Sequence, residues 1–363
     1  MPTANEPQST WGPLLRVSGR RKLVFALAAA FLSAAFTIGA LLALDVYLHH
    51  KFAEFAGLNV WGYRGPTVGR KQSREQRVFV IGGSTTFGYG VGWSDAFPAA
   101  LERRLQEDAR ASGAPVSVVN LAYNNEGAFS FLYTLHDYEY LQPDAVIFYT
   151  GYNDGGPSNT SAFRHESAIF QLTGYMPILP VILAEKAKSL RYGGDLDAAY
   201  RQEKTAFRPD LADRTSVLAL ETAEAISKSI ERQLGRLTER PRPAAVVADA
   251  SGCGEPFTRY CDSVRRAVED VLDHGRDVVV VGQPYISDLH VDQQRALDEM
   301  LGKRFAAHPG LRLVNLGNTV NLKDRTLAFD GMHLTVSGNE VIADSLVPVI
   351  RDVLAQRRTR PSR

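Results

Sequence analysis

The chain has 363 residues, which suffices for one or two domains, and its hydrophobic content of 45% is ordinary for a folded protein. Wholesale disorder and a polytopic membrane protein are therefore excluded. Its 41 Lys and Arg residues against 40 Asp and Glu residues leave a net charge of +1, so no broad basic field exists to bind nucleic acid. The two cysteines exclude a disulfide-dense fold and a zinc framework of Cys-x-x-Cys pairs.

The first element along the chain is an uncharged apolar stretch at residues 23–44, preceded by a cluster of basic residues. As a helix it would extend about 33 Å, enough to cross a hydrocarbon layer of about 30 Å. The positive-inside rule predicts a cytoplasmic tail at residues 1–22 and an extracytoplasmic chain after the span, which is periplasmic in a Gram-negative cell. A cleavable signal peptide is the alternative, although its apolar region is normally about 7 to 15 residues long.

The two cysteines gain a meaning if the chain is exported. In an oxidising compartment Cys253 and Cys261 would form a disulfide that closes a short loop. The alternative is a pair of unrelated buried thiols. Their spacing excludes a thioredoxin-type pair.

After a connector at residues 45–76, short apolar runs predict the strands of a parallel sheet. The runs are rich in β-branched residues and lack polar alternation, as expected of strands covered on both faces. Helical patterns lie between them, so we expect an α/β fold with right-handed crossovers. The predicted strands are residues 78–81, 116–121, 145–149, 278–281 and 311–316, and the predicted helices are residues 96–109, 129–140, 259–274, 291–307 and 338–356.

A long insertion at about residues 155–245 interrupts this alternation between the third and fourth predicted strands. It holds a proline-interrupted apolar run at residues 175–183 and a helical stretch at residues 215–237. The apolar run would fill a local core, cover an active site as a lid or contact a bilayer surface. The main domain then extends over residues 77–356, and a polar tail follows at residues 357–363.

The first predicted strand ends in Gly82, Gly83 and Ser84. Ligands of open parallel sheets bind beyond the carboxyl ends of the strands, so a serine at this helix entry is placed to react. A Walker phosphate loop is excluded because no Gly-Lys-Ser/Thr ending is present. The Gly-x-Ser-x-Gly elbow of the α/β hydrolases is excluded because Thr86 stands at its last glycine. An ordinary turn is the alternative.

Three further motifs follow later strands. A block ending at Gly127 follows the second strand, and its glycine amide is a candidate hydrogen-bond donor. After the third strand, Asn153 in Gly-Tyr-Asn-Asp offers a side-chain amide as a donor. After the fifth, Asp330 precedes His333 by three residues, a spacing that lets a carboxylate orient the ring and leaves Nε2 free to take a proton from a hydroxyl. Turn chemistry is the alternative for the Asn153 motif. For Asp330 and His333 the alternative is a chance spacing with a partly exposed histidine at a helix entry.

A metal site is not expected. Asp288, His290 and Asp292 have ligand types suited to a metal, but no companion cluster supports them.

Together the four motifs resemble those of the SGNH (GDSL-type) hydrolase family, in the same order along the chain. Gly83 stands where the Gly-Asp-Ser version has its aspartate, and the resemblance covers about residues 77–356. It implies a three-layer α/β/α sandwich with a flavodoxin-like five-stranded parallel sheet, and ester hydrolysis through an acyl-serine. By matching positions, Ser84 would be the nucleophile, His333 the base and Asp330 the residue that orients it. The oxyanion would be held by the Ser84 amide, the Gly127 amide and the Asn153 side chain.

The sequence therefore predicts a single-pass, extracytoplasmic serine esterase or acyl hydrolase that needs no metal or organic cofactor. Its substrate would be an ester of a carbohydrate or a lipid, and a carbohydrate deacetylase is one such enzyme. One alternative uses the same residues to transfer the acyl group to an envelope polysaccharide, as an O-acyltransferase. Another is a non-catalytic carbohydrate-binding or scaffolding protein on the same fold, against which the intact Ser84, Asp330 and His333 argue.

Overall fold

The computed structural model describes seven stretches of the chain, with the side chains of residues 108–112 excepted. They form two compact units, Met1–Tyr47 and Leu48–Arg363. The described stretches are residues 19–54, 57–155, 159–195, 207–208, 210–236, 252–306 and 308–359.

Helix α1 (Gly19–Phe52) contains the predicted apolar span and is longer at both ends. The apolar side chains of the span are exposed within the structure, from Leu23 to Leu44. By length and composition α1 is able to cross a membrane, and a signal sequence near an N-terminus has the same features. The side of the membrane on which the rest of the chain lies stays a prediction.

A parallel five-stranded sheet forms the centre of the second unit, in the order β2-β1-β3-β4-β5. This is the flavodoxin-like order of doubly wound folds, in which ligands bind at the carboxyl ends of β1 and β3, where the strand order reverses. All five strands predicted from the sequence are confirmed within a few residues. Their bounds are β1 Gln76–Gly82, β2 Val116–Asn120, β3 Ala145–Thr150, β4 Asp277–Gly282 and β5 Leu311–Asn315.

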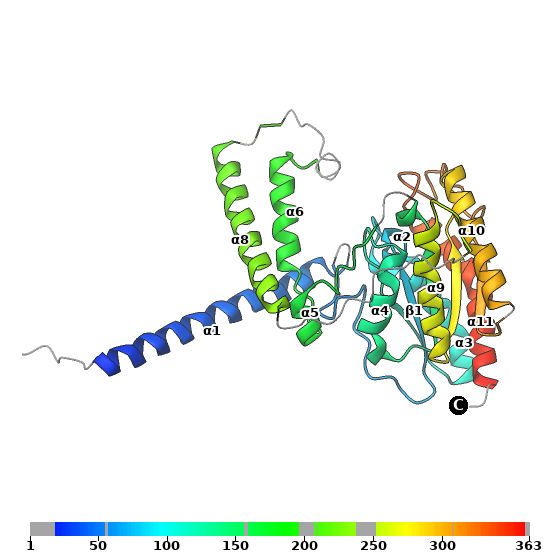
Figure 1. The fold of residues 1–363 in the computed structure, drawn as a ribbon, viewed down its shortest axis with the longest axis horizontal. Coiled ribbons are helices and arrows are strands. Elements are labelled where there is room, and N and C mark those ends of the chain that lie inside the picture. The colour runs from blue at the N-terminus through cyan, green and yellow to red at the C-terminus, as the bar shows by residue number, and fades with distance from the viewer. Residues whose placement is uncertain are drawn as a thin grey trace, which may run out of the picture. The chain divides into compact units, whose positions relative to one another are not determined.

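Helices cover both faces of the sheet, which confirms the three-layer α/β/α architecture (Figure 1). Successive side chains of a strand point to opposite faces. Val78 and Val80 of β1 accordingly pack in the cluster that includes α3 and α11, while Phe79 and Ile81 pack with α4, α9 and α10. The bounds of these helices are α3 Phe97–Ser112, α4 Phe131–Asp137, α9 Thr258–Asp273, α10 Asp288–Phe305 and α11 Val336–Thr359.

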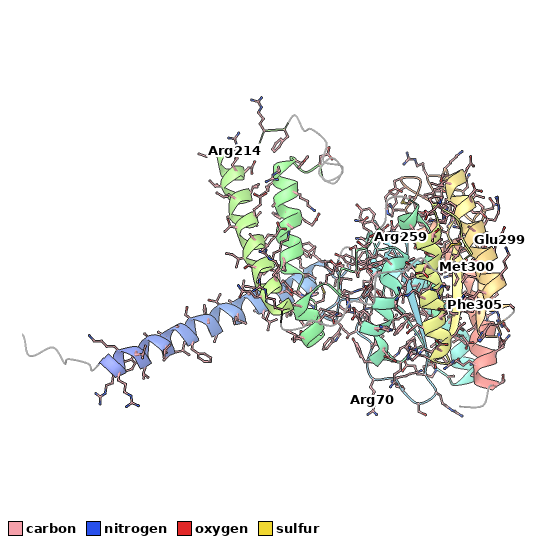
Figure 2. All side chains as sticks on the ribbon, viewed as in Figure 1. Arg70, Arg214, Arg259, Glu299, Met300 and Phe305 are labelled. Carbon is pink, nitrogen blue, oxygen red and sulfur yellow. A yellow bond between two sulfur atoms is a disulfide. The ribbon has the colours of Figure 1, made fainter. Side chains whose placement is uncertain are left out.

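The spacing of apolar residues explains how these helices attach. In α9, Val264, Ala267, Val268 and Val271 recur every three or four residues and are all fully buried against the sheet. Figure 2 shows Met300 and Phe305 on α10. Met300 is buried in the same cluster and Phe305 packs against it.

Two elements differ from the sequence prediction. The run at residues 311–316 was expected to be covered on both faces, but β5 is only partly buried, and Leu313 is 38% exposed. The helix expected at residues 129–140 is shorter, because the chain tightens into 3-10 turns at both ends of α4. The 3-10 turns are η1 Trp93–Asp95, η2 Ala128–Ser130, η3 Glu139–Leu141 and η4 Tyr152–Asp154.

Within its described residues, the insertion contributes the helices α5 (Ala168–Thr173), α6 (Leu179–Arg191) and α8 (Leu211–Gly235). Helices α6 and α8 lie side by side as a hairpin (Figure 1). The proline-interrupted apolar run at residues 175–183 is buried in its first part and begins helix α6 in its second part. Met176 and Ile178 are buried, with Met176 in the main core, and Pro180 stands in the first turn of α6, where its missing N–H costs no hydrogen bond.

Cys253 and Cys261 are joined in a disulfide. Cys261 lies on α9 and is fully buried in the core. The bridge therefore ties the segment before α9 to the layer that covers the sheet.

Candidate active site

Ser84 is the first residue of the short helix α2 (Ser84–Phe87), and only Gly83 separates it from the end of β1. It is partly exposed, while Thr85 and Thr86 behind it are buried. A Cβ at Gly83 would overlap the side-chain amide of Asn153, so a larger residue there would displace that amide. The Ser84 amide is at the start of α2, where no carbonyl of the preceding turn is available to it within the helix.

His333 and Asp330 lie in the loop between β5 and α11 and meet Ser84 at the carboxyl edge of the sheet. His333 Nε2 is 2.8 Å from Ser84 Oγ, and His333 Nδ1 is 2.6 Å from Asp330 Oδ2. This geometry fits an imidazole that donates its Nδ1 proton to the carboxylate and accepts the serine proton at Nε2.

The loop itself keeps Asp330 ionised. Asp330 Oδ1 accepts the backbone amides of Met332 at 2.9 Å and His333 at 2.7 Å. Burial alone would raise the pKa of Asp330, but these amides and the imidazole outweigh it and hold the pKa below its ordinary value. A charged carboxylate is the form that orients a histidine.

Two aromatic rings flank the His333 imidazole. The Tyr89 ring centroid is 4.7 Å from that of His333 at an interplanar angle of 47°, and the Phe329 centroid is 5.9 Å away at 19°. Tyr89 is 47% exposed, so one face of this aromatic wall is open to solvent. The rings restrict the orientation of His333 and form an apolar surface next to it.

The two other expected donors lie in the turns that follow β2 and β3. Asn153 Nδ2 donates one hydrogen bond to the Glu126 carbonyl at 2.8 Å and has a second proton available. In the described stretch 57–155, the backbone amide of Gly127 makes no hydrogen bond. The four sequence motifs thus converge on one edge of a sheet with flavodoxin-like strand order.

The strand order and the three layers are those that the resemblance to the SGNH (GDSL-type) hydrolases implies. No protein-family model and no curated protein matches this chain. Among solved structures, a lipolytic protein of the G-D-S-L family from Desulfitobacterium hafniense is 12% identical, and the match covers 76% of this chain and 99% of that one at a TM-score of 0.39.

Two further solved structures are similar to this chain. A psychrotrophic esterase from Pseudoalteromonas sp. is 10% identical, covering 77% of this chain and 99% of that one at a TM-score of 0.42. An acetyl-xylooligosaccharide esterase from Geobacillus is 13% identical, covering 76% of this chain and 94% of that one at a TM-score of 0.39. At these scores the likeness concerns the fold and carries nothing about the activity of this chain.

Sequence reasoning missed a buried ion pair that supports this site. Arg164 and Glu126, both with side chains 2% exposed, lie 3.3 Å apart. Arg164 also donates to the Leu121 carbonyl at 2.6 Å and to the Gly62 carbonyl at 3.2 Å. The insertion therefore contributes a cation that fastens the turn carrying Gly127. No motif marks this pair, because its two members are 38 residues apart.

A second missed residue is Gln283, which follows β4. Its Oε1 accepts the Tyr152 amide at 2.7 Å, and its Nε2 donates to Thr85 Oγ1 at 2.8 Å. Gln283 thereby links the turn after β3 to helix α2. The backbone of Gly151 has a φ of 142°, a conformation that favours glycine, and a Cβ there would clash with His290.

His290 belongs to this polar cluster. Burial lowers the pKa of His290 to about 4, so the ring is neutral, and its Nε2 lies 2.6 Å from Gln294 Nε2. Within the stretches that the structure describes, no group of three or more His, Cys, Asp or Glu residues is arranged to hold a metal ion.

Proposed function

We propose that this protein is a serine esterase that cleaves carboxylic esters through an acyl-serine intermediate. The observation that carries the proposal is the chain of contacts from Ser84 Oγ to His333 Nε2 at 2.8 Å and from His333 Nδ1 to Asp330 at 2.6 Å. A hydroxyl next to an oriented imidazole is the arrangement that activates serine as a nucleophile.

In the first half of the reaction, Ser84 Oγ attacks the ester carbonyl carbon while His333 Nε2 takes the hydroxyl proton. The carbonyl oxygen gains negative charge and is held by the Ser84 amide, the Gly127 amide and the Asn153 side chain. His333 then gives its proton to the departing alcohol oxygen, the ester bond breaks, and the acyl group stays on Ser84. Asp330 stabilises the imidazolium that forms between these two transfers.

In the second half, water replaces the alcohol. His333 Nε2 takes a proton from the water as its oxygen attacks the acyl carbon, and the same three donors hold the second oxyanion. The bond to Ser84 Oγ breaks, His333 returns the proton to Ser84, and the carboxylic acid leaves. No atom other than those of the enzyme, the ester and water takes part in this sequence.

The finer proposal is a deacetylase of acylated carbohydrates. It is supported by the exposed ring of Tyr89 next to His333, a flat apolar surface on which the apolar face of a sugar ring can pack.

A membrane-anchored, extracytoplasmic location is part of the same proposal. Helix α1 supports the anchor, and the Cys253–Cys261 disulfide supports an oxidising compartment.

A panel of esters graded by acyl length, from acetyl to decanoyl, tests this function. We expect hydrolysis with kcat/KM highest for acetyl and falling by about tenfold or more for the first added methylenes, because a deacetylase needs an acyl pocket that fits acetyl and excludes longer chains. A preference for long chains would contradict the deacetylase and favour lipolysis. Absence of hydrolysis across the whole panel would contradict the esterase itself.

A further inference from the structure

Asp154 lies behind the turn that carries Gly127 and has no role in the mechanism above. Its two carboxyl oxygens lie 3.0 and 3.1 Å from the backbone nitrogen of Ala128, whose N–H they accept. A Cβ at Gly127 would lie 2.5 Å from Asp154 Oδ1, so the carboxyl packs directly against this turn.

Asp154 lines a small cavity beneath the turn, together with Gly83, Thr150 and Gln283. Burial raises the pKa of Asp154 to about 7, against the opposing effect of the Ala128 amide. Burying a carboxyl group is unfavourable, and the hydrogen bond to Ala128 offsets only part of that cost. Because its burial is unfavourable, we expect Asp154 to have a function at this position.

The backbone of Gly127 explains what the contact does. Its φ of −111° and ψ of −167° are extended, and in an extended chain successive N–H groups point to opposite sides. With the Ala128 N–H directed at Asp154, the Gly127 N–H is directed away from Asp154.

We propose that Asp154 is a positioning residue that holds the Ala128 amide and thereby aims the Gly127 amide at the oxyanion. This inference rests on the proposed esterase function. Asp154 touches neither the substrate nor the reacting atoms.

Three variants separate positioning from a general structural role. Asp154→Ala removes the acceptor, Asp154→Leu removes it while keeping most of the volume, and Asp154→Asn keeps one acceptor oxygen. We expect Asp154→Ala and Asp154→Leu to lower kcat about 10-fold to 100-fold with KM nearly unchanged. An oxyanion donor acts in the transition state, and its complete loss lowers kcat by about 10²-fold to 10³-fold. The Asp154→Asn variant is expected to keep kcat within several-fold of the wild-type value.

Asp277→Ala is the matched control. Asp277 is also buried, but it is the first residue of β4. It therefore lies at the amino ends of the strands, whereas the candidate active site lies at their carboxyl ends. We expect this control to lower the melting temperature and leave kcat unchanged. If Asp154→Ala does not fold, the kcat of Asp154→Leu is the test of the positioning role.

An unchanged kcat in the folded Ala or Leu variant, or an equal loss in Asp154→Asn, would overturn the positioning role. If the wild-type protein hydrolyses no ester, the esterase function has failed instead. A wild type that is active together with a fully active Asp154→Ala variant rejects only the role of Asp154.

Discussion

Replacing Ser84 by alanine is expected to lower ester turnover by about 10⁴-fold to 10⁶-fold. The variant has no oxygen to form the acyl intermediate, and His333 loses the hydroxyl that lies 2.8 Å from its Nε2. The remaining donors around the oxyanion still stabilise direct attack by water, which is why a small residual rate is expected. The measurement is the steady-state rate of hydrolysis of an aryl acetate.

The control for this substitution is Ser94→Ala, in the 3-10 turn η1 after helix α2. The Ser94 hydroxyl lies at the surface, 3.4 Å from Glu54. We expect wild-type turnover from this variant. Turnover of the wild-type order in folded Ser84→Ala would mean that another residue performs the chemistry.

Replacing Arg164 by alanine is expected to lower the free energy of unfolding by about 3 to 5 kcal/mol. The change leaves the Glu126 carboxylate buried without its cation and deprives the Leu121 carbonyl of its donor. Urea denaturation followed by circular dichroism measures the loss. Arg295→Ala is the matched control, since Arg295 pairs with Asp292 in a bridge whose side chains are 63% and 58% exposed. An exposed pair contributes at most about 1 kcal/mol.

The loss in the Arg164 variant should depend on pH. Burial already raises the pKa of Glu126, with Arg164 opposing it, and removal of Arg164 raises that pKa further. The folded variant then binds a proton that the unfolded chain has released, so its stability falls as the pH rises from the ordinary carboxyl pKa toward the raised one. Glu126→Gln combined with Arg164→Met should recover much of the stability. A loss no larger than that of Arg295→Ala would contradict a supporting role for the buried pair.

The strands and the place of the site followed from simple rules. Apolar β-branched runs marked β1, β3 and β4, and the carboxyl ends of parallel strands share one edge, so motifs at those ends were expected to meet. The distance between Ser84 and His333 agrees with that expectation, although the two residues are 249 positions apart. Local pattern plus topology was sufficient for these features.

Other features depend on contacts that no local pattern encodes. The apolar run that forms β5 does not reveal that the strand is only partly buried. Arg164 and Glu126 are brought together by the path of the insertion, and Gln283 reaches Thr85 across the sheet edge. Asp154 was part of a recognised motif, but its task depends on the φ and ψ of Gly127, which the sequence does not reveal.

Covalent labelling with a fluorophosphonate tests the central claim most directly, because this probe reacts with a serine only when a neighbouring base activates it. We expect one adduct per folded chain, located on Ser84 by mass spectrometry, and none in Ser84→Ala, in His333→Ala or after heat denaturation. A folded wild-type protein that is not modified at Ser84, or is modified there equally well without His333, would contradict the account.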